Sequence, residues 1–199
     1  MRTILLSVVF AAGCATASGP ATHYSGEPFE LAARPSRISG QVCGMDLDVD
    51  VTRNGDGVAL SGFLDGKFPV HLSAHPVGGG VAIDGALGTT AGQSAVELRV
   101  AADALDGRVG YRSFALRANG DTLAGTMQIP DAIERPEVTL EGRAQLAALP
   151  MEAQAALLPA LLTCNVQTQG KWGRSELVVR VGGPAGALPH QSSALYSHE

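Results

Sequence analysis

The sequence has few aromatic residues and no cluster of basic side chains. Phenylalanine, tyrosine and tryptophan make up only 5% of the 199 residues, so leucine, valine and alanine must fill most of the hydrophobic core. The 14 basic residues are outnumbered by 19 acidic ones, which gives a formal net charge of −5. Because nucleic-acid binding relies on basic patches, this balance argues against a nucleic-acid partner. No apolar run reaches the roughly 20 residues that a membrane-spanning helix needs.

The common catalytic motifs are also missing. The sequence contains no G-x-S-x-G, S-x-x-K or H-E-x-x-H. The segment Gly88–Ser94 has a superficial likeness to a phosphate-binding loop, but its glycines are one residue too close and Gln93 replaces the required lysine. We therefore predict that the protein is not an enzyme and carries no cofactor. The alternative is a hydrolase whose catalytic residues come from distant parts of the sequence.

Two groups of residues could suggest a metal site. The alternating Asp46, Asp48 and Asp50 invite a calcium hypothesis, but the glutamate that ends an EF-hand loop is missing, so a solvated acidic face is the simpler interpretation. His71 and His75 fall on one face of an expected strand, about 13 Å apart, which is too far to hold one ion together. We predict no metal site.

The first fourteen residues have the pattern of an export signal. Arg2 is followed by the apolar run Ile4–Phe10 and by the small residues Ala11–Gly13, directly before Cys14. This pattern resembles the lipobox of bacterial lipoproteins. The resemblance implies that signal peptidase II cleaves before Cys14, and that acyl chains on this cysteine then anchor the protein in the cell envelope. Ala15, in place of an aspartate, implies the outer membrane. The alternative is an ordinary signal peptide and a soluble periplasmic protein.

The other two cysteines are Cys43 and Cys164. With Cys14 lipidated, they form one even pair in an oxidising compartment, which predicts a disulfide. Such a bond closes a loop of about 120 residues and stabilises the fold by up to ~4.7 kcal/mol on the chain-entropy model. Two buried free thiols, or pairing between molecules, are the alternatives. No histidine lies near either cysteine in the sequence, which argues against zinc.

The composition divides the chain into four parts. We expect a signal peptide over residues 1–13, the lipidated cysteine and a flexible tether over 14–37, a single β-rich domain over 38–181 and a disordered tail over 182–199. The tether includes His23, which we therefore expect in a flexible segment.

Alternation of apolar and polar residues recurs through the expected domain and is typical of half-buried strands. It is clearest over residues 46–51, 68–74, 96–100, 114–118 and 176–181. Gly-containing turn signals separate these segments, at 54–57, 65–66, 78–80, 106–107 and 119–120. The sequence therefore predicts a mainly β protein in which an antiparallel meander forms a curled sheet, a barrel or a sandwich.

Glycines recur within these strands on the apolar, inward side. Each of Gly62, Gly85, Gly125 and Gly142 follows an apolar residue by two positions. We interpret them as bends that let the sheet curl. Space for a ligand or for a packed helix is the alternative.

One segment, near residues 145–163, is rich in alanine and leucine and predicts a helix. Pro159 is expected to kink or end this helix, because proline lacks the backbone donor that a helix interior needs. We expect the helix to cover an open end or face of the sheet.

These observations favour a binding protein. The single tryptophan, Trp172, is flanked by Gly170, Lys171 and Gly173, and either contacts a partner or caps the core. We predict a non-catalytic cell-envelope lipoprotein, with a protein-binding or assembly-supporting β-domain that meets other envelope proteins. The alternative is a small β-barrel carrier for a lipid or another apolar molecule.

Overall fold

The computed structural model describes residues 20–90, 92–131, 135–164 and 176–184, which form thirteen strands and two helices. The strands are β1 (Thr22–Glu27), β2 (Phe29–Arg34), β3 (Arg37–Val42), β4 (Met45–Asn54), β5 (Gly57–Leu64), β6 (Phe68–Val77), β7 (Gly80–Thr89), β8 (Gly92–Val100), β9 (Ala104–Val109), β10 (Arg112–Asn119), β11 (Thr122–Gln128), β12 (Glu137–Glu141) and β13 (Glu176–Pro184). The helices are α1 (Arg143–Ala148) and α2 (Met151–Thr163). Neither helix is long and apolar enough to cross a membrane.

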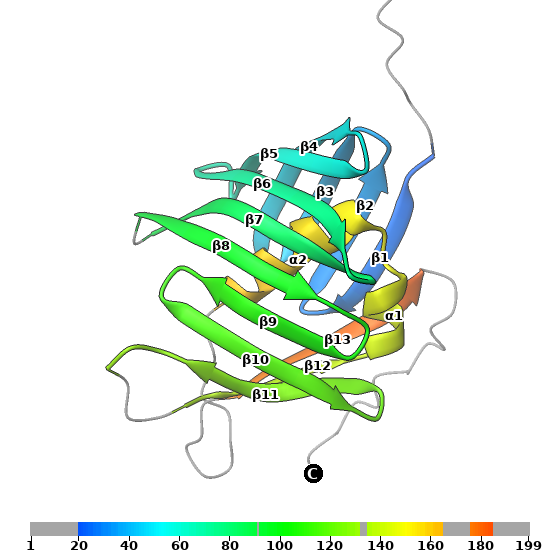
Figure 1. Cartoon of the computed structure of the whole chain (residues 1–199). Helices are drawn as coiled ribbons and strands as arrows, with labels where there is room; N and C mark the ends of the chain where they lie inside the picture. The colour runs from blue at the N-terminus through cyan, green and yellow to red at the C-terminus, as the bar shows by residue number, and fades with distance from the viewer. Residues whose placement is uncertain (1–19, 91, 132–134, 165–175, 185–199) are drawn as a thin grey trace, which may run out of the picture.

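The strands form a closed barrel, as Figure 1 shows. Strands β1 to β12 are antiparallel neighbours in sequence order, and β13 fits between β12 and β1. β13 is antiparallel to β1, with Glu27 opposite Arg180, but parallel to β12, with Thr139 opposite Val178. A closed ring with an odd number of strands cannot alternate in direction throughout, so one parallel pair is required. The prediction of a mainly β, curled sheet is confirmed, and the sheet is a barrel.

The parallel pair explains the place of the helices. Parallel neighbours need a crossover connection that carries the chain back to the end where the first strand began. Here the connection includes α1 and α2, and α2 runs inside the ring of strands (Figure 1). Ten consecutive residues of α2, Ala153–Leu162, are buried, which is typical of a helix with apolar neighbours on every side.

The helix was expected to cover an open end or face of the sheet, and α2 lies against the inner face of the closed barrel. Side chains alone just fill a barrel of about eight strands, so a wider ring needs an additional element in its interior. Helix α2 provides it and contacts β3, β5, β6, β7 and β9. The helical segment was predicted as one piece, but it is divided at Leu149–Pro150, and α2 continues through Pro159 to Thr163.

The barrel wall follows the predicted alternation. On β4, the side chains of Leu47, Val49 and Val51 are buried in the interior, whereas Asp48 and Asp50 are exposed outside. The same pattern recurs on the neighbouring strands and gives one continuous core between the wall and α2. The outer face is polar, so the wall has the water-facing exterior and apolar interior of a half-buried sheet.

Glycines lie in the middle of every second strand from β3 to β11. They are Gly40, Gly62, Gly85, Gly107 and Gly125. A Cβ atom at any of these positions would overlap the carbonyl oxygen of the preceding strand, so the two backbones approach too closely for a side chain. The interpretation of Gly62, Gly85 and Gly125 as bends fits this geometry. Gly142 differs, because it follows β12 and is the N-cap of α1 with φ 78°.

The boundaries expected for the domain need two corrections. Residues 22–37, expected in a flexible tether, form β1, β2 and the first residue of β3, and His23 lies exposed on β1. The few apolar residues of this segment suffice, because Phe29 and Leu31 pack into the core. At the other end β13 continues to Pro184, beyond residue 181. The expected signal peptide (1–13) and most of the expected tail lie outside the described residues.

Candidate functional site

The two ends of the barrel differ, and α2 connects them. We call one end the α1 rim, which consists of α1, the start of α2 and the turns at Gly55–Asp56 and Gly78–Gly79. The other end is the disulfide rim, which consists of Cys164 and the turns at Cys43–Gly44, Asp65–Lys67 and Gly110–Tyr111. Helix α2 enters the barrel at the α1 rim and ends at the disulfide rim.

At the disulfide rim the end of α2 is bonded covalently to the wall. Cys164, the C-cap of α2, forms a disulfide with Cys43 in the turn between β3 and β4, and the two Cα atoms are 6.2 Å apart. The disulfide predicted from the sequence is therefore present in this fold. It links residues 121 positions apart in the chain and fixes the central helix relative to the first half of the barrel.

Arg112 holds the same helix end from the opposite part of the wall. Its Nη1 donates to the carbonyl oxygens of Leu162, Thr163 and Cys164, at 3.2, 3.2 and 3.1 Å. The last carbonyls of a helix lack partners within the helix and form the negative end of its dipole, so a guanidinium is well matched to them. The Arg112 guanidinium also lies 5.6 Å from the centre of the Tyr111 ring.

Two exposed aromatic side chains lie at this rim. Tyr111 is 58% exposed at the tip of the β9–β10 turn, and Phe63 is 51% exposed near the end of β5, opposite Pro69 of β6. The other exposed large hydrophobic side chains of the described chain are the valines Val77 and Val178. Exposed aromatic residues on a rigid support are typical of protein-binding surfaces. The disulfide rim is therefore the candidate functional surface.

At the α1 rim an ion pair holds the start of α2. Arg53, near the end of β4, donates to Glu152 in the first turn of α2 at 2.6 Å, and the Glu152 side chain is only 13% exposed. A carboxylate there also interacts favourably with the positive end of the helix dipole. Tyr24 of β1 lies close by, and burial, followed by the charge of Glu152, raises its pKa above the ordinary value. Both ends of α2 are thus fixed to the wall.

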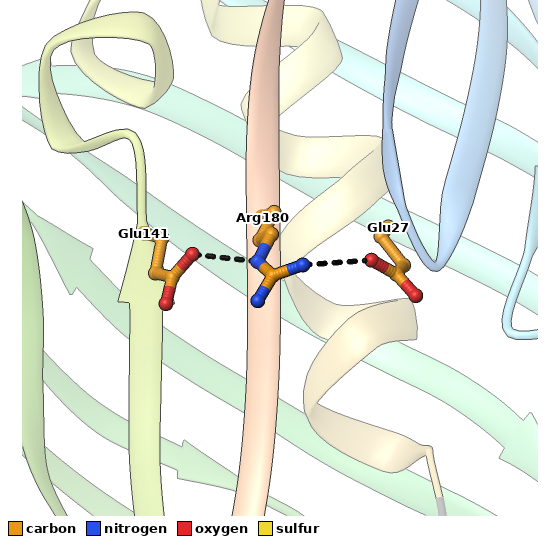
Figure 2. Close-up of polar contacts among 3 residues, drawn as sticks. All are labelled: Glu27, Glu141 and Arg180. Carbon is orange, nitrogen blue, oxygen red and sulfur yellow. Dashed lines mark hydrogen bonds and ion pairs between the residues drawn. The ribbon is translucent and has the colours of Figure 1, made fainter. Parts of the chain in front are cut away.

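Ion pairs also connect neighbouring strands on the outer surface. Figure 2 shows the pairs that flank β13, where Arg180 binds Glu141 of β12 at 2.7 Å and Glu27 of β1 at 3.3 Å. These hydrogen bonds and charges raise the pKa of Arg180 further above its ordinary value. Three similar pairs, Arg37–Asp48, Arg108–Glu97 and Arg117–Asp106, link other strands. Each is exposed and contributes little alone, but Arg180 connects three strands where the barrel closes.

The residues considered for metal binding are separated along the outer wall. Asp48 pairs with Arg37, and Asp46 accepts a hydrogen bond from Gln41 at 3.0 Å. His71 and His75 are both exposed on β6. Within the described ranges, no three His, Cys, Asp or Glu side chains are placed to hold one ion.

The hollows found among the described residues are shallow. One of about 330 Å³ lies on the outer wall beside His75, Glu97 and Asp106. Another of about 180 Å³ lies at the α1 rim, beside Arg143 and the buried Gln154. The amide of Gln154 is engaged, since its Nε2 donates to the Leu149 carbonyl at 2.9 Å. A third hollow, of about 230 Å³, lies on the outer wall beside His23, Glu30 and Ser39. His23 of β1 and Ser39 of β3 both lie level with Ala32 of β2, so their backbones are two strand spacings apart, about 10 Å. None of these three hollows therefore places a nucleophile directly beside a base.

The structure describes two of the four site residues predicted from the sequence. The structure joins Cys43 and Cys164, whereas Cys14 and Trp172 lie outside the described residues. Sequence reasoning missed Arg112 and Tyr111. Tyr111 follows a glycine in a short turn, and nothing in that local sequence indicates a binding role. The role of Arg112 could not be predicted either, because it depends on the position of α2 inside the barrel.

Comparison with known proteins returns no match: no family model, no curated protein and no solved structure matches the chain.

Proposed function

We propose that this protein is a non-catalytic lipoprotein of the cell envelope. Acyl chains on Cys14 anchor it to the outer membrane, and it binds other envelope proteins through its disulfide rim. The observation that carries the proposal is the exposure of Tyr111 and Phe63 at a rim where the disulfide and Arg112 hold the backbone in place. A rigid surface loses little conformational entropy on binding, so exposed aromatic rings on it are effective contacts.

The leader supports the location of the protein. The Ile4–Phe10 run and the small residues before Cys14 match the lipoprotein pattern, and a disulfide between Cys43 and Cys164 is suited to an oxidising compartment. Mass spectrometry of the N-terminal peptide tests the anchor: the expected result is an acylated Cys14 at the new N-terminus. An unmodified cysteine, or cleavage after it, would contradict the anchoring.

The carrier hypothesis has less support, because α2 occupies the barrel interior. Leu157, Leu158 and Leu161 of α2 are fully buried there, and an apolar ligand of any size would have to displace them. Native mass spectrometry of the gently extracted protein distinguishes the two functions. The expected result is the mass of the lipidated protein alone, whereas a reproducible additional small molecule would favour the carrier.

Site-specific photo-crosslinking in intact cells tests the binding surface. A photoreactive residue in place of Tyr111 or Phe63 is expected to give an adduct with one envelope protein. The matched control is the same residue in place of Ser73, which is exposed on the outer wall at β6. Equal adducts at all three positions, or adducts only at Ser73, would overturn the assignment of the disulfide rim.

A further inference from the structure

Both ends of the described barrel lie at the α1 rim. Strand β1 begins there at Thr22 and runs to the turn at Pro28, whose carbonyl accepts a hydrogen bond from the Cys43 amide at the disulfide rim. Strand β13 runs the opposite way and ends at Pro184, opposite Tyr24. In Figure 1 the arrowheads of β8 and β13 point to the end of the barrel where α1 lies. A chain that enters the barrel at Thr22 therefore enters it at the α1 rim.

The segment between the proposed anchor and the barrel is short. Thr22 follows Cys14 by eight residues, because β1 begins well before the end of the tether expected from composition. Eight residues span at most about 29 Å when fully extended, and about 16 Å on average as a flexible chain. The 13 residues of α2 alone extend about 20 Å from one rim towards the other.

We infer that the barrel stands on the membrane with its α1 rim towards the lipid headgroups and its disulfide rim pointing away. This inference rests on the proposed lipidation of Cys14. In the inverted orientation, the short segment would have to run along the whole wall in a nearly extended form, at a large cost in conformational entropy. The surface thus given to the headgroups carries the exposed charged side chains of Arg34, Arg53 and Asp56, together with the exposed Val77 at the end of β6.

This orientation determines where the disulfide rim can meet a partner. Tyr111 and Phe63 are displaced from the membrane surface by roughly the height of the barrel, so the disulfide rim meets a protein outside the lipid layer rather than the lipid itself. A lipid-facing role for these aromatic rings would require the opposite orientation.

Energy transfer to the membrane tests the orientation. The lipidated protein is reconstituted in vesicles of phosphatidylethanolamine and phosphatidylglycerol that carry an acceptor dye on the headgroups. A donor dye is attached through an unnatural amino acid at position 56 or at position 67, the exposed sites of Asp56 and Lys67 in the turns at the two ends of β5. Because β5 has eight residues, the two donors differ in height by about 20 Å for a typical strand tilt.

The expected result is several-fold more efficient transfer from position 56 than from position 67. Insertion of about twenty Gly and Ser residues after Ala15 is expected to reduce this difference, because the longer linker frees the barrel to rotate. Equal or reversed transfer in the lipidated protein would overturn the orientation and leave the anchor intact. An unmodified Cys14, with no protein floating with the vesicles, would overturn both the anchor and the orientation.

Discussion

Cys43 and Cys164 join the turn that precedes β4 to the C-cap of the central helix, with their Cα atoms 6.2 Å apart. At the far end of β4, Arg53 pairs with Glu152 in the first turn of the same helix. One wall strand is thus connected to α2 near both of its ends, once by a covalent bond and once by an ion pair. These two attachments prevent the helix from sliding along the barrel axis, and its apolar packing stabilises it within the barrel.

Reduction of the disulfide is expected to destabilise the barrel by about 2–5 kcal/mol. The reduced chain gains conformational freedom in the unfolded state, since the bond closes a loop of 121 residues. Urea unfolding of the wild type with and without dithiothreitol measures the change. Reduction is preferable to replacement of Cys43, because it breaks the bond without changing any side chain of the folded protein. As a control, Cys14→Ser with its disulfide intact should keep the wild-type midpoint.

Arg112→Gln is expected to lower the free energy of unfolding by about 1.5–3 kcal/mol, because three carbonyls at the end of α2 lose a charged donor. Arg108→Gln is the matched control, since Arg108 pairs with Glu97 on the exposed outer wall and its loss should cost below about 1 kcal/mol. Urea titration compares the two variants. Equal losses would show that Arg112 does not stabilise the helix end.

Gly62→Ala is expected to destabilise the barrel by about 3 kcal/mol or more, because the new methyl group would overlap the backbone of β4 at Asp48. Gly120→Ala is the control, because it changes the backbone preference of a glycine position without creating a steric overlap. Gly120 lies in a turn with φ 61° and open space around it, so alanine there should cost only about 1–2 kcal/mol. A smaller loss at Gly62 than at Gly120, measured by urea unfolding, would contradict the close approach of β4 and β5.

The pair of Glu97 and Arg108 predicts a pH effect with a definite sign. A hydrogen bond from Arg108, helped by its charge, holds the pKa of Glu97 below the ordinary value of about 4.3. Because the folded-state pKa is the lower one, the stabilisation is present above pH ~4.3 and is lost as the pH falls through the folded-state pKa. Carboxyl-detected NMR should show the Glu97 pKa rising in Arg108→Gln. It should stay unchanged in Arg37→Gln, whose partner is Asp48.

Part of the fold could be predicted from residues close together in the sequence. Alternation such as that of Leu47, Asp48 and Val49 predicts strands, because successive side chains of a strand point to opposite faces. The disulfide between Cys43 and Cys164 could be predicted because these are the two cysteines left after Cys14, and paired cysteines oxidise in an oxidising compartment. The length of the tether was overestimated. Strands β1 and β2 carry few apolar residues, and the burial of those residues depends on pairing with β13 and β3.

Most of the strands, the glycine positions within them, the helical segment and the cysteine pair follow from the sequence alone, because each depends on the local properties of a few residues. Three features emerge only in the folded chain: thirteen strands close into a ring, α2 lies inside it, and Arg112 meets the end of this helix. These features depend on contacts between residues far apart in the chain. The odd number of strands requires a parallel pair, and the crossover that this pair needs is the segment that fills the barrel.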